Sequence, residues 1–157
     1  GSGKTTLGKI VSKKLNKKFF DIDQQIEAQE GMKISDLFLQ KGEPFFRKLE
    51  EKISLQNLKK TNSIISLGGG AFINKKIQNE VLKNHISIWL KWDNKNLINR
   101  IKNSQKRPIA IRLDDFELDK LINKRSKSYA KAKYQIKCDN LSKLEITKKI
   151  IDLNERN

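Results

Sequence analysis

The sequence begins with Gly-Ser-Gly-Lys-Thr-Thr, whose residue types suit the binding of phosphate groups. A phosphate-binding loop of the pattern G-x-x-x-x-G-K-[ST] holds phosphate oxygens with backbone N–H groups and a lysine, and holds Mg²⁺ with a hydroxyl. Gly3, Lys4 and Thr5 fill the last three positions of this pattern. An ordinary glycine-rich turn is the alternative, but a helical pattern follows directly. We therefore expect an ATP site at Gly1, Ser2, Gly3, Lys4, Thr5 and Thr6.

Two carboxylates follow a short apolar run. Asp21 and Asp23 are two residues apart, which places both side chains on the same side of an extended chain. If the strand ends between them, the two carboxylates diverge toward a metal and a substrate. The alternative for Asp23 is a purely structural one, in which it caps the helix that follows.

An arginine and a glutamate lie further along the chain. Arg47 precedes Glu50 by three residues, so the two side chains share one face of a helix. A guanidinium in that position could bind the carboxylate of a ligand, with Glu50 fixing its rotamer. A surface ion pair of little consequence is the alternative.

Three glycines and two further arginines complete the candidate residues. Gly68, Gly69 and Gly70 follow a buried apolar run, where a backbone without side chains can approach a ligand closely. Arg107 lies in a polar segment without periodicity, residues 103–114, which we interpret as a lid over a transferring phosphoryl group. Arg100 lies on the helix before this segment. A solvated side chain is the alternative for either arginine.

Apolar runs that alternate with helical patterns must position these residues. The sequence predicts four strands, at residues 18–21, 63–67, 85–90 and 134–138. It predicts helices at residues 5–15, from 42 onward, 74–82, 93–102, 116–131 and 142–153. This order indicates parallel crossovers in one α/β domain, a three-layer α/β/α sandwich. A phosphate-binding loop normally follows a strand, so we expect a first strand to be missing before Gly1.

Composition limits the other classes of function. The chain has 157 residues and a formal net charge of +16, with 34 lysines and arginines against 18 acidic residues. The basic residues are scattered and accompany no nucleic-acid-binding signature, so we expect no nucleic-acid partner. The single cysteine excludes a disulfide within the chain and fits a reducing cytoplasm. We expect no association with a membrane, since no stretch is apolar enough to cross one.

Taken in order, these motifs resemble the shikimate kinase family of P-loop small-molecule kinases. The resemblance covers residues 1 to about 132 and includes D-x-D, F-R-x-x-E, G-G-G-A, R-P and R-x-x-x-Y after the loop. It implies five parallel strands with the strand of the phosphate loop in the middle. It also implies a single domain over residues 1–157, with a substrate-binding region at about 21–60 and the lid at about 103–114.

The resemblance implies phosphorylation of the 3-hydroxyl of shikimate by ATP and Mg²⁺, in the synthesis of chorismate and aromatic amino acids. By position, the catalytic residues would be Lys4, Asp23 and Arg107. Shikimate would be bound by Asp23, Arg47, Gly68, Gly69, Gly70 and Arg125. ATP would be bound by the loop, Arg100 and Arg107, and the metal by Thr5 and Asp21. We expect a cytoplasmic monomer.

One feature departs from the family pattern, and three other functions compete with this assignment. Ser126–Ser128 stand between Arg125 and Tyr129, where the family often has a proline. Another P-loop kinase, such as one for gluconate, shares the loop and the general fold. A nucleic-acid-binding module or an inactive scaffold would leave the ordered motifs unexplained.

Overall fold

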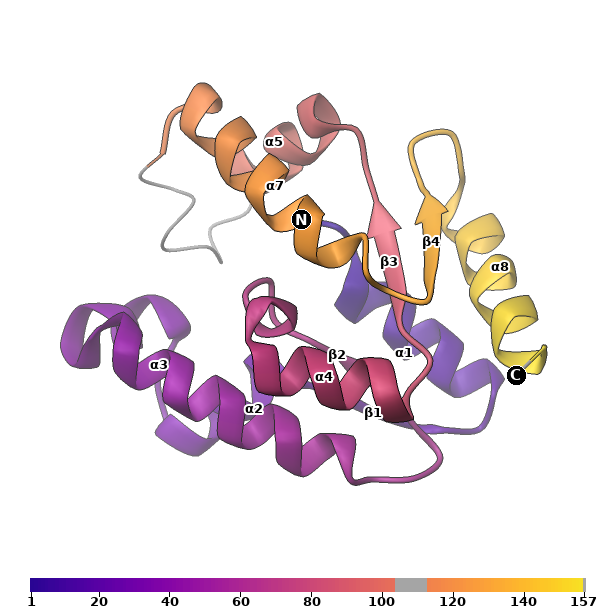
Figure 1. Cartoon of the computed structure of the whole chain (residues 1–157), viewed down its shortest axis with the longest axis horizontal. Helices are drawn as coiled ribbons and strands as arrows, with labels where there is room; N and C mark the ends of the chain where they lie inside the picture. Colours follow the sequence, from indigo (N-terminus) through magenta and orange to yellow (C-terminus); the bar gives the residue numbers. More distant parts are fainter. Residues whose placement is uncertain (104–112, 157) are drawn as a thin grey trace.

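The computed structural model describes residues 1–103 and 113–156. Helices alternate with short strands, and Figure 1 shows their arrangement. The elements in chain order are α1 (Lys4–Lys14), β1 (Lys18–Asp21), α2 (Ile22–Glu30), α3 (Ile34–Leu58), β2 (Ser63–Ser66), the short 3₁₀ helix η1 (Ala71–Ile73), α4 (Lys75–Asn84), β3 (Ile88–Lys91), α5 (Asn94–Lys102), α7 (Asp115–Tyr129), β4 (Tyr134–Lys137) and α8 (Lys143–Glu155).

The four predicted strands are present, and all their pairings are parallel. β1 pairs with β2 in the register Lys18↔Ser63, and β3 pairs with β4 in the register Ile88↔Tyr134. Within the described ranges, the two pairs are not hydrogen-bonded to each other, so the continuous sheet that we expected is divided in two. The α/β class with parallel crossovers is confirmed.

A cavity of about 650 Å³ lies between the two pairs and is lined by residues of both β2 and β3. The family resemblance places a fifth, central strand at this position, and none of the described residues occupies it. Helix α1 connects the two halves, because it contacts β1 and β2 on one side and α8 on the other. Its Leu7 is buried in a cluster with Ile136, Cys138 and Ile146.

Side-chain caps explain why several helices begin where the sequence predicts. The Asn74 side chain accepts hydrogen bonds from the backbone at the start of α4, and Asp93 does the same for α5. Ser142 and Glu145 form a reciprocal capping box at the start of α8. These three predicted starts are confirmed.

The segment from Ile22 to Leu58 differs from our expectation, which placed a helix only from Gly42 onward. Helix α2 and the first part of α3 precede that point. Gly42 has φ 78° and ψ 166°, a non-helical conformation that kinks α3, and Pro44 lies at the start of its second part. The kinked helix packs on α2 through a core of Ile22, Ile26, Leu37, Phe46, Leu49 and Ile53.

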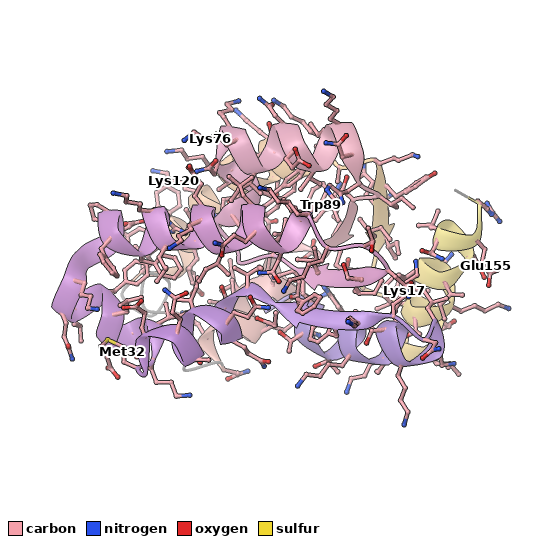
Figure 2. The ribbon with its side chains drawn as sticks, turned by 90° about the horizontal axis from the view of Figure 1, so that it is seen from below. Lys17, Met32, Lys76, Trp89, Lys120 and Glu155 are labelled. Atoms are coloured by element: carbon pink, nitrogen blue, oxygen red, sulfur yellow. The ribbon has the colours of Figure 1, made fainter. Side chains whose placement is uncertain are left out.

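Charged side chains lie on the surface of the fold and around a second cavity, away from the predicted site residues. Figure 2 shows Lys76 extending away from helix α4, and 73% of this side chain is exposed.

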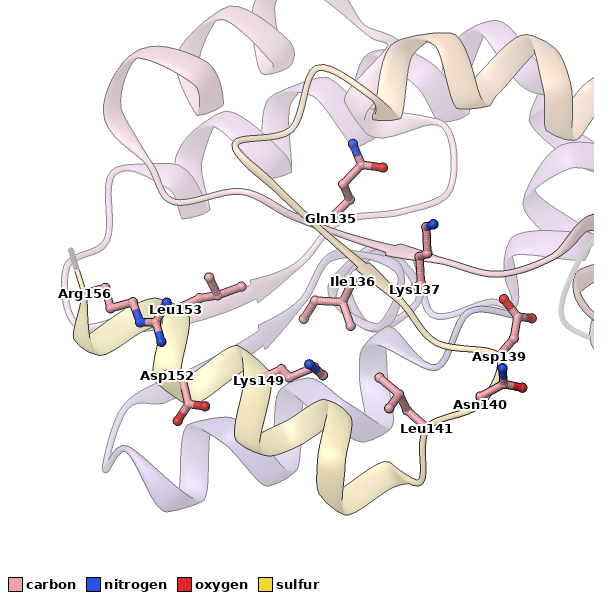
Figure 3. A pocket seen from close by; sticks show the side chains of 10 residues that line it. All are labelled: Gln135, Ile136, Lys137, Asp139, Asn140, Leu141, Lys149, Asp152, Leu153 and Arg156. Atoms are coloured by element: carbon pink, nitrogen blue, oxygen red, sulfur yellow. The ribbon is translucent and has the colours of Figure 1, made fainter.

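A second cavity, of about 550 Å³, lies between β4 and α8 (Figure 3). Its lining includes Lys137, Asp139 and Lys149 but none of the predicted site residues.

The cysteine lies in the core beside this strand. Cys138 is fully buried, and its thiol donates a hydrogen bond to the carbonyl of Ile136. Burial, with a smaller contribution from Asp139, raises the pKa of the thiol to about 11. Among the helices within residues 1–103 and 113–156, none has the length and apolar character needed to cross a membrane.

Candidate active site

The phosphate loop, residues 1–6, lies at the N-terminus of α1, as the sequence predicts. Gly3 is the residue before the helix and has φ 88° and ψ 12°, in the left-handed region that favours glycine. Lys4 begins the helix, and its ammonium donates to the hydroxyl of Ser2 at 3.3 Å. The unpaired backbone N–H groups of a helix N-terminus and its dipole favour an anion at this position.

Side chains from the segment after β3 and from helix α5 hold the backbone of this loop. The indole of Trp92 donates to the carbonyl of Ser2 at 3.1 Å, and the Arg100 Nε donates to the carbonyl of Gly1 at 2.7 Å. The guanidinium of Arg100 lies 4.2 Å from the centre of the Trp92 ring. The structure thus brings the predicted Arg100 to the phosphate loop. It also adds Trp92, which sequence reasoning missed.

Thr5 and Asp21 face each other beside the loop. The Thr5 hydroxyl donates to Asp21 Oδ2 at 2.5 Å, and Asp21 Oδ1 accepts from the backbone N–H of Gln24. Asp21 is therefore the cap of α2, so the structural alternative for Asp23 is wrong. Hydroxyl and carboxylate oxygens are ligands that suit Mg²⁺.

The residues described contain no cluster of three or more histidine, cysteine or acidic side chains able to hold a metal. Thr5 and Asp21 nevertheless place a hydroxyl and a carboxylate within hydrogen-bond distance of each other, and both groups could act as oxygen ligands.

The carboxylate of Asp23 lies against Gly68. Asp23 lies in the first turn of α2, after β1 has ended, so it diverges from Asp21. A Cβ atom on Gly68 would lie 2.5 Å from Glu50 Oε1 and 2.6 Å from Asp23 Oδ1. Both carboxylates therefore abut this glycine, and any side chain at Gly68 would displace them.

Arg47 is held by two carboxylates on its own helix. Its Nη1 is 2.7 Å from Glu50 Oε2, and its Nη2 is 3.0 Å from Glu43 Oε1. A Cβ on Gly70 would overlap the guanidinium of Arg47. The expectation that Glu50 fixes the Arg47 rotamer is confirmed, and only 2% of Glu50 is exposed.

The electrostatics of this pair reflect its burial. Burial raises the pKa of the Glu50 carboxyl, and the charge of Asp23 adds to this effect. Arg47 and, to a smaller extent, Arg125 oppose it. Burial alone would lower the pKa of Arg47, but the charge and hydrogen bonds of Glu50 and Glu43 raise it above its ordinary value. The arginine is therefore firmly charged.

Helix α7 brings a second arginine toward this cluster. Arg125 is half-buried, and its charge acts on Glu50. One turn later, the hydroxyl of Tyr129 donates a hydrogen bond to the carbonyl of Gly69. Gly68, Gly69 and Arg125 line the same cavity as the phosphate loop. Arg107 and most of the predicted lid lie outside the described residues, and Thr6 is exposed on α1.

A family model, "Shikimate kinase", matches residues 1–154 of this chain. The chain belongs to the shikimate kinase family. A shikimate kinase from Sulfurihydrogenibium sp. is 38% identical over 96% of this chain and 90% of that protein. The expected family membership is confirmed.

Solved shikimate kinase structures resemble the fold. That of Aquifex aeolicus has 33% sequence identity and a TM-score of 0.86, over 98% of this chain and 90% of the other. The structure from Acinetobacter baumannii, solved in complex with shikimate, has a TM-score of 0.91 at 24% identity, over 99% and 88% of the two chains. The family's α/β P-loop fold is therefore the fold of this chain.

Proposed function

We propose that this chain transfers the γ-phosphoryl group of ATP to the 3-hydroxyl of shikimate, giving ADP and shikimate 3-phosphate. The observation that carries the proposal is the cluster of Asp23, Arg47 and Glu50 against the glycine loop formed by Gly68, Gly69 and Gly70. A carboxylate and a fixed guanidinium together suit a ligand with both hydroxyl groups and a carboxylate. Family membership supports the same substrate.

The substrate would be oriented from two sides. Arg47 and Arg125 would bind its carboxylate, because guanidinium groups match the planar geometry of a carboxylate. Asp23 would accept hydrogen bonds from the hydroxyls and serve as the candidate base for the 3-hydroxyl proton. Gly68, Gly69 and Gly70 would face the substrate. Phosphoryl transfer depends mainly on such positioning and on neutralisation of charge.

The phosphates of ATP would lie at the N-terminus of α1. Backbone N–H groups of the loop would hold them, with Lys4 reaching the β- and γ-phosphates. Thr5 and Asp21 would hold Mg²⁺, which supplies charge neutralisation at the phosphate oxygens when bound. Arg100 and Arg107 would contact the nucleotide, and residues 103–114 would serve as the lid.

The wider setting follows from the same reaction. The domain of residues 1–157, with its substrate-binding region at about 21–60, would act as a cytoplasmic monomer on small molecules, without nucleic acid or membrane. The product would feed the synthesis of chorismate and aromatic amino acids.

ADP release tests the proposal. The purified protein with ATP and Mg²⁺ is offered shikimate, gluconate or a nucleoside monophosphate. We expect turnover with shikimate alone. At a shikimate concentration near the wild-type KM, turnover should be lost in Asp23→Ala, and also in Arg47→Ala because the KM for shikimate rises. Lys48→Ala, at an exposed position on the same helix, is the matched control and should retain turnover. Turnover with gluconate instead would replace this proposal with the other small-molecule kinase.

A further inference from the structure

Tyr129 links helix α7 to the loop of Gly68–Gly70, two elements that the proposed function places on the substrate. Helix α7 carries Arg125, and Tyr129 lies one turn later on the same helix. The hydroxyl of Tyr129 donates to the carbonyl of Gly69, at the middle of the glycine loop. Its ring lies 6.0 Å from that of Trp89 and packs against the core around Ala71 and Phe72.

The rest of the glycine loop contacts the other side of the site. Gly68 abuts the carboxylates of Asp23 and Glu50, and Gly70 abuts the guanidinium of Arg47. Three consecutive glycines have no side chains with which to anchor a loop, and their backbone has the largest conformational freedom to lose. Contacts from neighbouring elements must therefore determine the conformation of the loop.

The two arginines proposed to bind one carboxylate belong to separately packed parts of the molecule. Helix α3, with Arg47, packs in the core of Ile22, Ile26 and Leu49. The first part of α7 packs instead with α5, through Leu118 and Ile122. Tyr129 packs against a third cluster, which contains residues of α3, η1 and α4. It thus lies where the two parts meet.

We propose that Tyr129 is a positioning residue for the substrate carboxylate, which fixes the glycine loop to helix α7 and so sets Arg125 relative to Arg47. This inference rests on the proposed function, because it assigns a role in binding the same substrate. The hydroxyl itself need not touch the substrate. Its effect passes through the Gly69 carbonyl to the loop against which Arg47 and Asp23 lie.

The test is Tyr129→Phe, which keeps the ring and its packing and removes only the hydroxyl. We expect the KM for shikimate to rise about fivefold, the size of one net hydrogen bond. The KM for ATP and kcat should change less than about twofold. Tyr134→Phe, on strand β4, is the matched control and should leave all three values unchanged.

A double-mutant cycle separates positioning from a general structural role. In an Arg125→Ala background, Tyr129→Phe should have little further effect on the KM for shikimate, because the arginine that Tyr129 positions is absent. An equal rise in both backgrounds, or an unchanged KM in Tyr129→Phe, would overturn the inference. Absence of shikimate turnover in the unsubstituted protein would instead refute the proposed function, so the two failures are distinguishable.

Discussion

The proposed substrate side and the proposed phosphate side of this site position their charges in different ways. Around Gly68–Gly70, charged side chains hold one another, and Glu50 is almost fully buried beside Arg47. Around the phosphate loop, the exposed Arg100 and the Trp92 indole instead hold backbone carbonyls. The substrate side is thus preorganised by its own ion pairs, whereas the phosphate side presents N–H groups and one ammonium to a ligand that brings its own charge.

The largest effect is expected on kcat, from a substitution in the phosphate loop. Lys4→Ala removes the cation expected at the β- and γ-phosphates, and we expect kcat to fall by about a hundredfold or more. Arg47→Ala on the other side should act mainly on the KM for shikimate. Lys9→Ala, on an exposed face of α1, serves as the control in steady-state kinetics. A similar fall in kcat and a similar rise in the KM for shikimate in both site variants would contradict the contrast between the two sides.

Gly70→Ala tests how tightly the substrate side is packed. The added Cβ would overlap the guanidinium of Arg47, so we expect the KM for shikimate to rise about tenfold as the arginine shifts. Gly31→Ala is the control. Gly31 has φ 64° and open space around it, so this change should cost about 1 kcal/mol of stability without altering KM. A Gly70→Ala enzyme with normal KM would show that Arg47 is not held by close packing.

Glu50→Gln should weaken the binding of shikimate without lowering the folding stability of the protein. The variant keeps the shape of the side chain but removes the charge that holds Arg47, so the KM for shikimate should rise about fivefold. We expect no loss of folding stability at neutral pH, because burying the ionised carboxylate carries a desolvation cost that glutamine avoids. A large loss of stability in urea unfolding would show that the ion pair serves folding.

The same variant has an expected pH dependence. Because burial raises the pKa of Glu50, the folded protein binds this proton more tightly than the unfolded chain does. The resulting stabilisation is present below the ordinary pKa of 4.5 and is lost as pH rises through the raised value. The free energy of unfolding of Glu50→Gln should therefore increase relative to that of the wild type between pH 4.5 and 7.5. No change across this range would contradict the raised pKa.

The smallest expected effect concerns the phosphate loop. Trp92→Phe removes the hydrogen bond to the Ser2 carbonyl while keeping an aromatic ring beneath Arg100. We expect the KM for ATP to rise about threefold, and the KM for shikimate to stay unchanged. The two constants are measured on one preparation, so the second serves as the internal control. A matching rise in both would indicate that the two sides are coupled.

Local sequence patterns predicted what depends on neighbours in the chain. Gly3 at the start of α1, and Asn74, Asp93 and Ser142 as caps, each act on backbone groups within a few residues. The F-R-x-x-E spacing likewise placed Arg47 and Glu50 together, because three residues make nearly one turn. The family resemblance supplied the roles for these residues.

Features that depend on distant contacts were not predictable in the same way. Helix α2 entered the sequence analysis only through the alternative that Asp23 caps a helix. Only Ile22 and Ile26 among its residues are buried, which gives a short and weak helical pattern. Trp92 contacts Ser2 across 90 positions of sequence, and no local signal identifies such a pair. The glycines at 68 and 70 were expected to admit a ligand, but their immediate neighbours are the protein's own Asp23, Glu50 and Arg47.

The buried thiol of Cys138 has a practical consequence for labelling this protein at chosen positions. The chain has one cysteine, and its burial and high pKa leave very little thiolate to react at neutral pH. A second cysteine placed on an exposed helix face would therefore take a maleimide dye or spin label selectively, without prior removal of the native residue. Two such cysteines, one on α3 and one on α7, would carry a pair of labels that reports the separation of the two arginine-bearing helices during turnover.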